Sequence, residues 1–408
     1  MNMAIQSATH KKSLGASVAI VLPCLNEALT IEWCVARSLE TLREIESRFG
    51  VPGEVIVADN GSTDGSQGLA EAAGGRVISV RRPGYGSALM GGIRATEATY
   101  VIMGDADKSY DFMESVPMIG RLIDGVDLCM GSRFKGKIMP GAMPWKNQYI
   151  GNPVLSGILR LLFRTKLSDA HCGLRAFRRD AIDQLDLSSS GMEFASEMVL
   201  KSVLQGLSVD EVPITLHPDG RDRPPHLNPW RDGFRHLVYM LLLSPTHLFI
   251  WPAIVMFIVG LALMTMLLLA GDSTNVQIWG IRFGDHWTVV ASSALIVSVQ
   301  TTTAGILALH YSYQKGYRRP PENMTWLRRL SSLGNWVVVG ALLFAAGLVW
   351  AFSITLGWIA SEFSALDQMR NMIASGTLVV TGMQIIFSGL LMTILAGNRA
   401  SHFRISDG

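Results

Sequence analysis

The chain has 408 residues, of which 49% are hydrophobic and 17% charged, and its formal net charge at pH 7 is +2. This length is enough for two domains, and the near-neutral charge, without basic runs interleaved with aromatic residues, gives no indication of nucleic-acid binding. The four cysteines, Cys24, Cys34, Cys129 and Cys172, lack Cys-x-x-Cys spacing, so packed, reduced thiols are expected rather than disulfides or a zinc site.

The N-terminal residues 1–16 are polar, contain His10, Lys11 and Lys12, and lack an apolar core. They predict a mobile tail rather than a signal peptide. Regular alternation of apolar and polar runs begins only at residue 17.

Strand-like and helical runs alternate from residue 17 to residue 227. Near-continuous apolar strands separated by helices predict an α/β fold, a mostly parallel sheet with helices on both faces. The strand-like runs lie at residues 17–22, 54–58, 76–80, 100–103, 128–131 and 208–213. The helical runs lie at residues 28–49, 66–73, 87–98, 112–123, 151–163 and 193–205.

Polar residues or glycines follow each of the first four strands. Because ligands bind beyond the carboxyl ends of the strands in open sheets of this kind, these clusters predict one shared binding site. The clusters are Asn26 with Glu27, Asp59 with Asn60, Gly84 with Gly86, and Asp105 with Asp107.

The pair Asp105 and Asp107 follows the apolar run 100–103 after Gly104. Carboxylate oxygens suit Mg²⁺ or Mn²⁺, and such an ion can neutralise a diphosphate leaving group. An Asp-x-Asp triplet is also common in solvated turns, so the pair alone indicates either a metal site or a turn.

The order of the motifs is more specific than any one of them. Residues 18–27 (VAIVLPCLNE), 55–65 (VIVADNGSTDG), 105–107 (DAD), 131–134 (GSRF) and 169–175 (DAHCGLR) follow one another along the chain. In this order they resemble family-2 glycosyltransferases of the polyprenyl-phosphate type, typified by dolichol-phosphate mannose synthase. The resemblance extends over about residues 17–230. It implies a GT-A nucleotide-sugar-binding domain over residues 17–227.

The resemblance also implies a donor site. Pro23, Asn26 and Glu27 would surround the base and ribose of the nucleotide, and Asp59 would bind one of them. The family more often has two acids where this chain has Asp59 and Asn60, which leaves the base open. The alternative for Asp59 is a purely local turn.

Residues 82–86 (RPGYG) stand where relatives commonly have a Gly-Lys-Gly loop. Gly84 and Tyr85 would belong to the nucleotide site. Gly84 would let the backbone approach the diphosphate, while Tyr85 in place of lysine removes a cation. Asp107 would be a direct metal ligand, and Asp105 a second ligand or a ribose or sugar partner. Ser109 stands where mannose synthases often have glutamine, which shifts weight from GDP-mannose toward another donor.

The resemblance implies a polyprenyl phosphate acceptor, whose phosphate needs cations that position it. Arg133 matches the acceptor-phosphate arginine of the family, and Lys146 and Arg175 are further candidates; surface solvation is the alternative for Arg133 and Lys146. Asp169 is expected to hold sugar hydroxyls, or else to form an ion pair with Arg175 that serves only the fold. His171 is interpreted as a structural side chain rather than a base.

A loop rich in proline and charge, residues 218–227, precedes an amphipathic run. The resemblance implies that this loop is a lid from which Arg221 or Arg223 reaches the diphosphate. The run at residues 229–243 has one apolar face and basic residues elsewhere, which predicts amphipathic helix at the membrane interface over residues 228–245.

Four apolar stretches occupy the C-terminal part, at residues 247–270, 288–313, 333–358 and 373–396. Each is near the ~20 residues that cross a ~30 Å hydrocarbon core, which predicts a four-helix transmembrane domain over residues 246–398. Buried helices of a large soluble protein are the alternative, which the charge-poor interiors disfavour.

The loops of this domain differ in charge. The connection at residues 314–332 carries five lysines or arginines, whereas the other two connections have only Arg282 and Arg370. Because positive loops stay inside, this connection, the catalytic domain and both termini, including the tail at residues 399–408, are expected in the cytoplasm.

The sequence therefore predicts an integral-membrane, inverting hexosyltransferase that depends on Mg²⁺ or Mn²⁺. Its expected partners are a nucleotide-sugar donor, a polyprenyl phosphate acceptor and the lipid bilayer, and two copies could form a homo-oligomer through the transmembrane helices. UDP-glucose with undecaprenyl phosphate is the first choice, and GDP-mannose with dolichyl or undecaprenyl phosphate is the alternative. A membrane scaffold with an inactive transferase domain is the non-enzyme alternative, against which Asp105, Asp107 and Arg133 argue.

Overall fold

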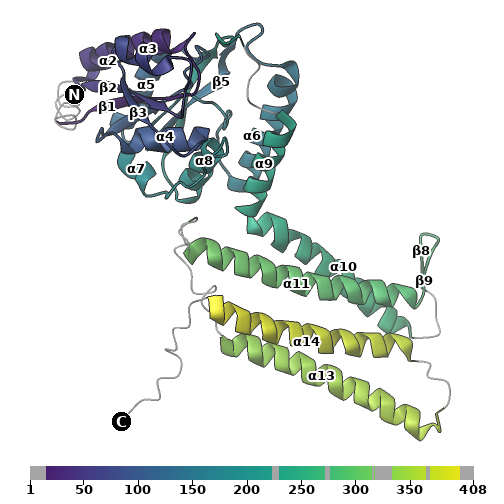
Figure 1. The fold of residues 1–408 in the computed structure, drawn as a ribbon. Helices are drawn as coiled ribbons and strands as arrows, with labels where there is room; N and C mark the ends of the chain where they lie inside the picture. Colours follow the sequence, from purple (N-terminus) through teal and green to yellow (C-terminus); the bar gives the residue numbers. More distant parts are fainter. Residues whose placement is uncertain are drawn as a thin grey trace, which may run out of the picture. The chain divides into compact units, whose positions relative to one another are not determined.

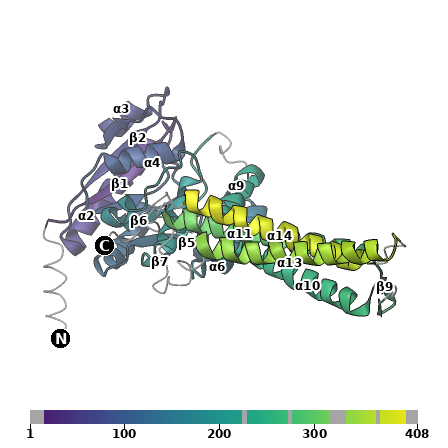
Figure 2. The same cartoon turned by 90° about the horizontal axis from the view of Figure 1, so that it is seen from below.

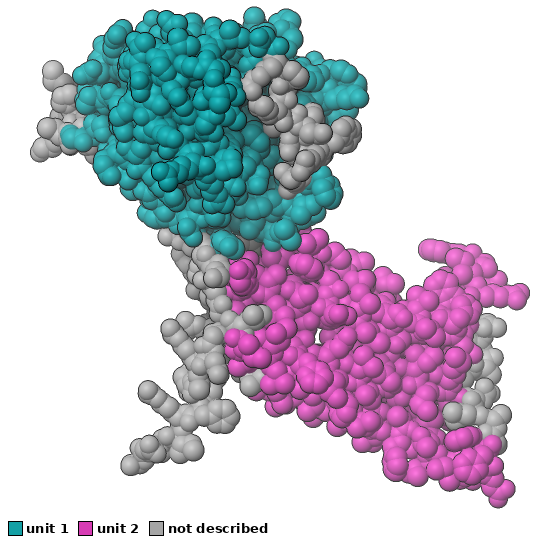
Figure 3. Space-filling view, viewed as in Figure 1, with its two compact units in different colours: residues 1–243, 316–319 teal, residues 244–315, 320–408 magenta. Residues whose placement is uncertain are grey.

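The computed structural model describes residues 15–222, 229–271, 276–314, 317, 333–363 and 368–395. The chain divides into two compact units (Figure 3): residues 1–243 with 316–319, and residues 244–315 with 320–408. Most of the expected N-terminal tail, Arg223, the charged positions of the expected cytoplasmic loop and the C-terminal tail lie outside the described residues.

The first unit is built on a seven-stranded sheet with the strand order β3-β2-β1-β4-β6-β5-β7. Strand β6 runs antiparallel to both of its neighbours, and the other strand pairs are parallel. The predicted mostly parallel α/β sheet is therefore confirmed. The strands are β1 (Val18–Cys24), β2 (Gly53–Asp59), β3 (Arg76–Ser79), β4 (Tyr100–Met103), β5 (Leu128–Ile138), β6 (Arg175–Arg178) and β7 (Val209–Leu216).

Helices cover both faces of this sheet, and their order along the chain follows the predicted runs. They are α2 (Ile31–Phe49), α3 (Ser66–Ala72), α4 (Tyr85–Arg94), η1 (Phe112–Ser115), α5 (Val116–Ile123), η2 (Asn147–Gly151), α6 (Asn152–Phe163), α7 (Arg179–Asp183), α8 (Phe194–Leu204) and α9 (Pro229–Leu242). The sequence did not predict β6 and α7, because four residues with an arginine at each end form no apolar run.

Alternating side chains of β1 supply two separate cores. Val18, Ile20 and Leu22 are fully buried against α2, α3 and α5, whereas Ala19 and Val21 are fully buried on the side of α4, α6 and α8 (Figure 1). Successive side chains of a strand point to opposite faces, and full burial of a side chain the size of valine or leucine contributes roughly 1.5–3 kcal/mol. The sheet is consequently fixed between two helical layers.

The second unit contains four helices long and apolar enough to cross a membrane, which confirms the four predicted spans. These helices run alongside one another (Figure 2). A short hairpin after the first of them was not predicted. The elements are η3 (Thr246–Ile250), α10 (Trp251–Ala270), β8 (Val276–Ile278), β9 (Ile281–Phe283), α11 (His286–Gln314), α13 (Leu333–Ala360) and α14 (Met369–Leu395).

Helices α13 and α14 approach each other at glycines. A Cβ at Gly382 would lie 2.5 Å from the backbone nitrogen of Phe344, and one at Gly340 would lie 2.7 Å from the carbonyl oxygen of Gly382. Small residues at such positions let helix backbones come close within a membrane. The contact therefore needs glycine on both helices.

Arg370 joins three helices of this unit at one end. It is 1% exposed, its Nη1 donates to the carbonyl oxygens of Leu267 (3.0 Å) and Gly271 (2.6 Å), and its Nε lies 2.7 Å from Oδ1 of Asp285. Free carbonyls at a helix C-terminus favour a cation. Arg370, at the start of α14, thus caps α10 and holds the residue before α11.

Replacing Arg370 by methionine should lower the thermal unfolding midpoint of the purified protein, because the carbonyls lose their donor. Leaving a buried polar group unpaired costs about 1–3 kcal/mol. Arg282→Met, at an exposed position of β9, is the matched control and should leave the midpoint near wild type. Equal midpoints for the two variants would contradict the capping role.

Candidate active site

The carboxyl ends of β1, β2 and β4 meet at one edge, because these strands are parallel and β1 pairs with both of the others. The loop after β1 is tied to the loop after β2. The backbone N–H of Asn26 donates to Oγ of Ser62 (2.9 Å), its Oδ1 accepts from the N–H of Thr63 (2.8 Å), and the N–H of Glu27 donates to Oγ of Ser66 (2.9 Å). Asn26 therefore serves to hold these loops together.

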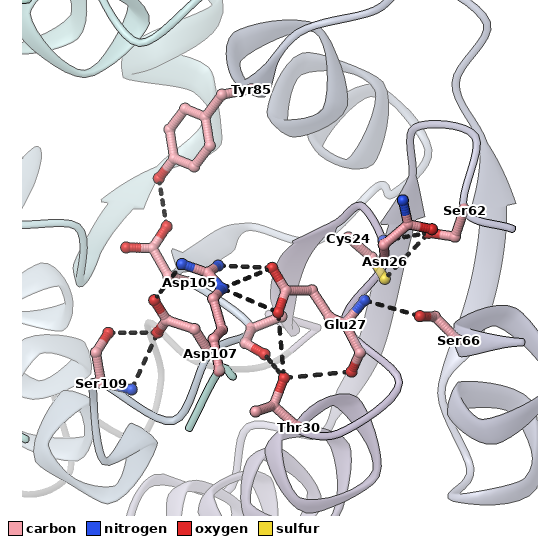
Figure 4. A network of polar contacts seen from close by, with 12 residues as sticks. Cys24, Asn26, Glu27, Thr30, Ser62, Ser66, Tyr85, Asp105, Asp107 and Ser109 are labelled. Carbon is pink, nitrogen blue, oxygen red and sulfur yellow. Dashed lines mark hydrogen bonds and ion pairs between the residues drawn. The ribbon is translucent and has the colours of Figure 1, made fainter. Parts of the chain in front are cut away.

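Three acidic side chains converge at this edge (Figure 4). Glu27, Asp105 and Asp107 are directed toward the same region, and Arg221 joins two of them: its Nη2 lies 2.6 Å from Oε1 of Glu27 and its Nη1 lies 2.9 Å from Oδ2 of Asp107. The sequence predicted Arg221 as a diphosphate contact; in this structure its partners are the carboxylates. Arg223, the other candidate, lies outside the described residues.

Asp105 is held by Tyr85, the first residue of α4, whose hydroxyl donates to Oδ1 of Asp105 at 2.9 Å. Burial of the carboxyl, and then the charge of Asp107, raise the pKa of Asp105 to about 6. The sequence predicted Tyr85 as a nucleotide-site residue that lacks the charge of a lysine. Its hydroxyl has a positive role as a donor to the acidic cluster.

Asp107 is held by its own turn. The backbone N–H and the hydroxyl of Ser109 both donate to Oδ1 of Asp107, at 3.0 and 2.5 Å. Ser109, which stands where mannose synthases often have glutamine, therefore orients the carboxylate. The hydroxyl of Thr30 donates to the carbonyl oxygen of Ala106 (2.6 Å), which fixes the Asp-x-Asp turn against the start of α2.

The carboxylate pair fits a divalent cation. Its oxygens are hard ligands, and the Arg221 guanidinium already provides positive charge beside Asp107. Among the residues that the structure describes, no group of three or more His, Cys, Asp or Glu side chains could hold a metal ion. Mg²⁺ is commonly bound through only one or two carboxylates together with substrate phosphates. Asp105 and Asp107 match that arrangement.

Asp59 is buried and hydrogen-bonded within its own loop, and its contact with the nucleotide stays a prediction. The side chain is 1% exposed, Oδ2 accepts from the N–H of Gly61 (3.0 Å) and from Nε2 of Gln67 (2.6 Å), and Oδ1 accepts from the N–H of Ser62 (3.2 Å). Burial alone would raise the pKa of Asp59, but hydrogen bonds led by those from Ser62 and Gln67 lower it. This geometry agrees with the alternative of a local turn. Pro23 of β1 lies beside Ala58 in the sheet.

Asn60 organises the following loop, which sequence reasoning missed. Its Nδ2 donates to the carbonyl oxygens of Val80 (2.9 Å) and Arg82 (2.8 Å), and its Oδ1 accepts from the N–H of Gly84 (2.7 Å). An aspartate could not donate to the two carbonyls. The structure of this loop therefore explains why the chain has asparagine at position 60, where the family more often has a second acid.

The glycines of residues 82–86 are required by packing within the protein. A Cβ at Gly84 (φ +125°) would lie 2.2 Å from the carbonyl oxygen of Ser190, and one at Gly86 would lie 2.3 Å from that of Ser189. The N–H of Ser87 donates to the same Ser190 oxygen at 3.1 Å. Close approach of a diphosphate is thus not needed to explain either glycine.

Arg133 and Asp169 form a buried pair. Nε and Nη2 of Arg133 lie 2.6 and 2.7 Å from the two carboxylate oxygens, and the N–H of Arg133 also donates to Oδ2 of Asp169 (3.1 Å). Burial alone would raise the pKa of Asp169, but the Arg133 guanidinium outweighs burial and lowers it. The carboxylate of Asp169 is therefore engaged by Arg133, and its contact with sugar hydroxyls stays a prediction.

Arg175 does not form the predicted ion pair with Asp169. It is fully buried and donates through Nε, Nη1 and Nη2 to the carbonyl oxygens of Cys172 (2.8 Å), Ala195 (2.5 Å) and Ala170 (3.2 Å). The carboxylate of the expected ion pair belongs to Arg133 instead. Three of the five N–H groups of Arg175 serve backbone carbonyls, and its role at the acceptor phosphate stays a prediction.

Lys146 precedes η2 and is exposed, so a phosphate could reach it from solvent.

His171 has its pKa lowered to about 3, chiefly by burial, and its ring lies 5.0 Å from that of His236. This agrees with the structural interpretation of His171. The four cysteines are buried and free, as expected.

Two buried acids outside the predicted set support the site. Glu197 accepts from the N–H groups of Ser188 and Ser189 (3.1 and 2.8 Å), next to the segment that packs on Gly84. Glu211 accepts from the N–H groups of Ser168 and Asp169. The only sequence signal for Glu211 was a charged residue inside a predicted strand.

Comparison with known proteins places both parts of the chain. Residues 19–186 match the family described as glycosyl transferase family 2, and residues 306–396 match the family 2 C-terminal transmembrane region. The chain is 33% identical over 380 residues to the low-salt glycan biosynthesis hexosyltransferase Agl6 of Haloferax volcanii, covering 93% of this chain and 89% of that protein.

Two shorter matches are to relatives with more specific names. The chain is 29% identical over 200 residues to a dolichyl-phosphate hexose transferase of Haloferax volcanii, covering 48% of this chain and 81% of that protein. It is 28% identical over 214 residues to the polyprenol monophosphomannose synthase of Mycolicibacterium smegmatis, covering 48% of this chain and 76% of that protein.

Asp169→Asn should destabilise the first unit, because Arg133 would keep a buried charge without its carboxylate. Breaking a buried ion pair on one side costs about 3–5 kcal/mol, which a lower thermal unfolding midpoint would report. The matched control is Asp183→Asn, which removes an exposed partner 3.5 Å from Nε of Arg179 and should cost no more than about 1 kcal/mol. A midpoint unchanged by Asp169→Asn would contradict the pairing.

Proposed function

The chain belongs to glycosyltransferase family 2 and is a membrane glycosyltransferase, and we propose that it transfers a hexose from a nucleotide diphosphate to a polyprenyl phosphate at the cytoplasmic face of the membrane. The observation that carries this proposal is the acidic cluster at the carboxyl edge of the sheet, in a chain that also has four membrane-spanning helices. The dolichyl-phosphate and polyprenol-phosphate activities in the names of two relatives support the acceptor class.

On this proposal the donor binds beside Asp105 and Asp107. These two carboxylates would hold Mg²⁺ or Mn²⁺, which when bound neutralises the charge of the diphosphate leaving group. Tyr85 and Ser109 keep the carboxylates oriented through the hydrogen bonds described above. Arg221, already at this edge, is the cation placed to meet the diphosphate.

The acceptor needs positioning more than activation. A phosphate monoester is mostly doubly ionised at pH 7, since its second pKa is about 6. One of its oxygens forms a bond to the anomeric carbon while the bond from that carbon to the diphosphate oxygen breaks, and the nucleoside diphosphate leaves with the electron pair. Attack opposite the leaving group inverts the anomeric carbon. Arg133 and Lys146 are the proposed phosphate contacts.

Exposed apolar side chains on the first unit support a position at the lipid surface. In α9, Phe234 and Leu242 are 66% and 60% exposed, while Met240 is buried in the core. Tyr149 of η2 and Leu161 of α6, a helix that contacts α9, are 69% and 72% exposed. Amphipathic helices of this kind bury one face at the boundary between headgroups and acyl chains. They would bring the site to the level of the lipid phosphate.

The donor is the finer part of the proposal. UDP-glucose is the first choice, because Ser109 stands where mannose synthases often have glutamine. The Ser109 hydroxyl is hydrogen-bonded to Asp107. GDP-mannose is the alternative, which the name of one relative favours.

The full-length protein in nanodiscs should convert polyprenyl phosphate to a lipid-linked hexose when supplied with one nucleotide sugar from a radiolabelled panel. Asp107→Asn should lower transfer roughly 100-fold or more, because a bound metal contributes several kcal/mol of charge stabilisation. Asp124→Asn, at an exposed position, is the control and should transfer normally. Undiminished transfer in excess EDTA would sink the metal assignment, and no transfer from any donor would sink the proposed function.

The orientation can be tested by thiol labelling, since the native cysteines are buried. A cysteine at Ser331, in the positive connection, should resist an impermeant reagent in intact cells and react after permeabilisation. A cysteine at Trp279, which is 98% exposed in the turn between β8 and β9, should react in intact cells. Labelling at position 331 but not at position 279 in intact cells would show that the orientation is opposite to the proposed one.

A further inference from the structure

Glu211 is a buried carboxylate with four donors. Its Oε1 accepts from the backbone N–H groups of Ser168 (2.7 Å) and Asp169 (2.9 Å). Its Oε2 accepts from the Ser168 hydroxyl (2.8 Å) and lies 2.9 Å from Nζ of Lys135. The side chain of Glu211 is 2% exposed, whereas that of Lys135 is 50% exposed.

These contacts fix the segment that supplies the partner of Arg133. Glu211 binds the N–H of Asp169, and the carboxylate of Asp169 binds Nε, Nη2 and the backbone N–H of Arg133. The Ser168 hydroxyl also lies 2.7 Å from that of Ser132, the residue before Arg133. Two chains of hydrogen bonds thereby connect Glu211 on β7 to Arg133 on β5. One passes through Asp169, and the other passes through Ser168 and Ser132.

We infer that Glu211 is a positioning residue, which sets the guanidinium of Arg133 through the Ser168–Asp169 segment. The inference rests on the proposed function, in which Arg133 contacts the acceptor phosphate. Glu211 itself touches no substrate. A negative charge is needed at this position because all four partners are donors and an ionised carboxylate is an acceptor only.

The strand register gives a reason for this support. Strands β5 and β7 pair in register up to Ser132 and Pro213, the register then shifts, and pairing resumes at Lys137 and Thr215. Arg133 therefore lies in the irregular stretch between the two paired segments. Side-chain contacts have to fix its backbone where the strand pairing does not.

Glu211→Gln tests this role without changing the size of the side chain. The uncharged amide oxygen is a weaker acceptor for the N–H groups of Ser168 and Asp169, and the amide nitrogen cannot accept from Lys135 or from the Ser168 hydroxyl, which would have to reorient, so the contacts that fix the segment are weakened. We expect the apparent KM for polyprenyl phosphate to rise about tenfold, the effect of one lost bond to a charged group, while the KM for the nucleotide sugar stays at the wild-type value. A change confined to the donor KM, or no change, would overturn the inference.

A double-mutant cycle separates positioning from a general structural effect. If Glu211 acts through Arg133, Glu211→Gln should have little further effect on the acceptor KM in the Arg133→Ala background. The same fold-change in both backgrounds would show that Glu211 acts independently of Arg133 and would overturn the inference.

Glu114→Gln is the matched control. Oε2 of Glu114 accepts from the N–H of Thr215 (2.8 Å), which lies on the same strand, β7. This variant should leave both KM values near wild type. Should Glu211→Gln fail to fold, Ser168→Ala removes only the hydroxyl links to Glu211 and Ser132, and should raise the acceptor KM about twofold to fivefold; an unchanged KM would overturn the inference.

Hydrogen exchange keeps this test distinct from the proposed function. In the full-length protein, Glu211→Gln should speed amide exchange at Ser168 and Asp169, and Glu114→Gln should not. Wild-type protein that transfers no hexose would refute the proposed function alone. Exchange at these two amides that is unchanged by Glu211→Gln would overturn the positioning role, whatever the activity.

Discussion

The site depends on holding several carboxylates together at the edge of one sheet. Glu27, Asp105 and Asp107 converge there because β1 and β4 are parallel neighbours, and like charges in a poorly solvated place oppose one another's ionisation. The raised pKa of Asp105 records this, since burial and the charge of Asp107 are its main causes. Arg221 offsets the charge of Glu27 and Asp107. An acidic cluster of this kind persists only with a cation beside it.

Hydrogen bonds from neutral side chains orient the groups that face the site. Tyr85 holds Asp105, and Ser109 holds Asp107. Asn60 holds the loop before Gly84, because its amide satisfies two carbonyl oxygens and one N–H at once. These contacts are local consequences of where β1, β2 and β4 end, so the fold and the site are built by the same parallel pairing.

Much of the fold could be predicted because apolar periodicity reports burial directly. The strands β1, β2 and β4 and the four membrane spans carry apolar runs, and α2 carries its buried residues at helical spacing. Strand β6 does not, since two of its four residues are arginines. Its antiparallel placement depends on pairing with β4 and β5, which no local pattern encodes.

The partners of buried arginines could not be predicted for a related reason. Arg133 and Arg175 both stand in polar motifs, yet one binds a carboxylate and the other three backbone carbonyls. The choice is made by chain geometry, which brings Asp169 beside β5 and leaves Arg175 under the turn that precedes it. A carboxylate partner keeps a guanidinium charged and oriented, whereas three carbonyls occupy every nitrogen that Arg175 has to offer. Of the two, Arg133 is the one whose side-chain partner, Asp169, is hydrogen-bonded to Glu211.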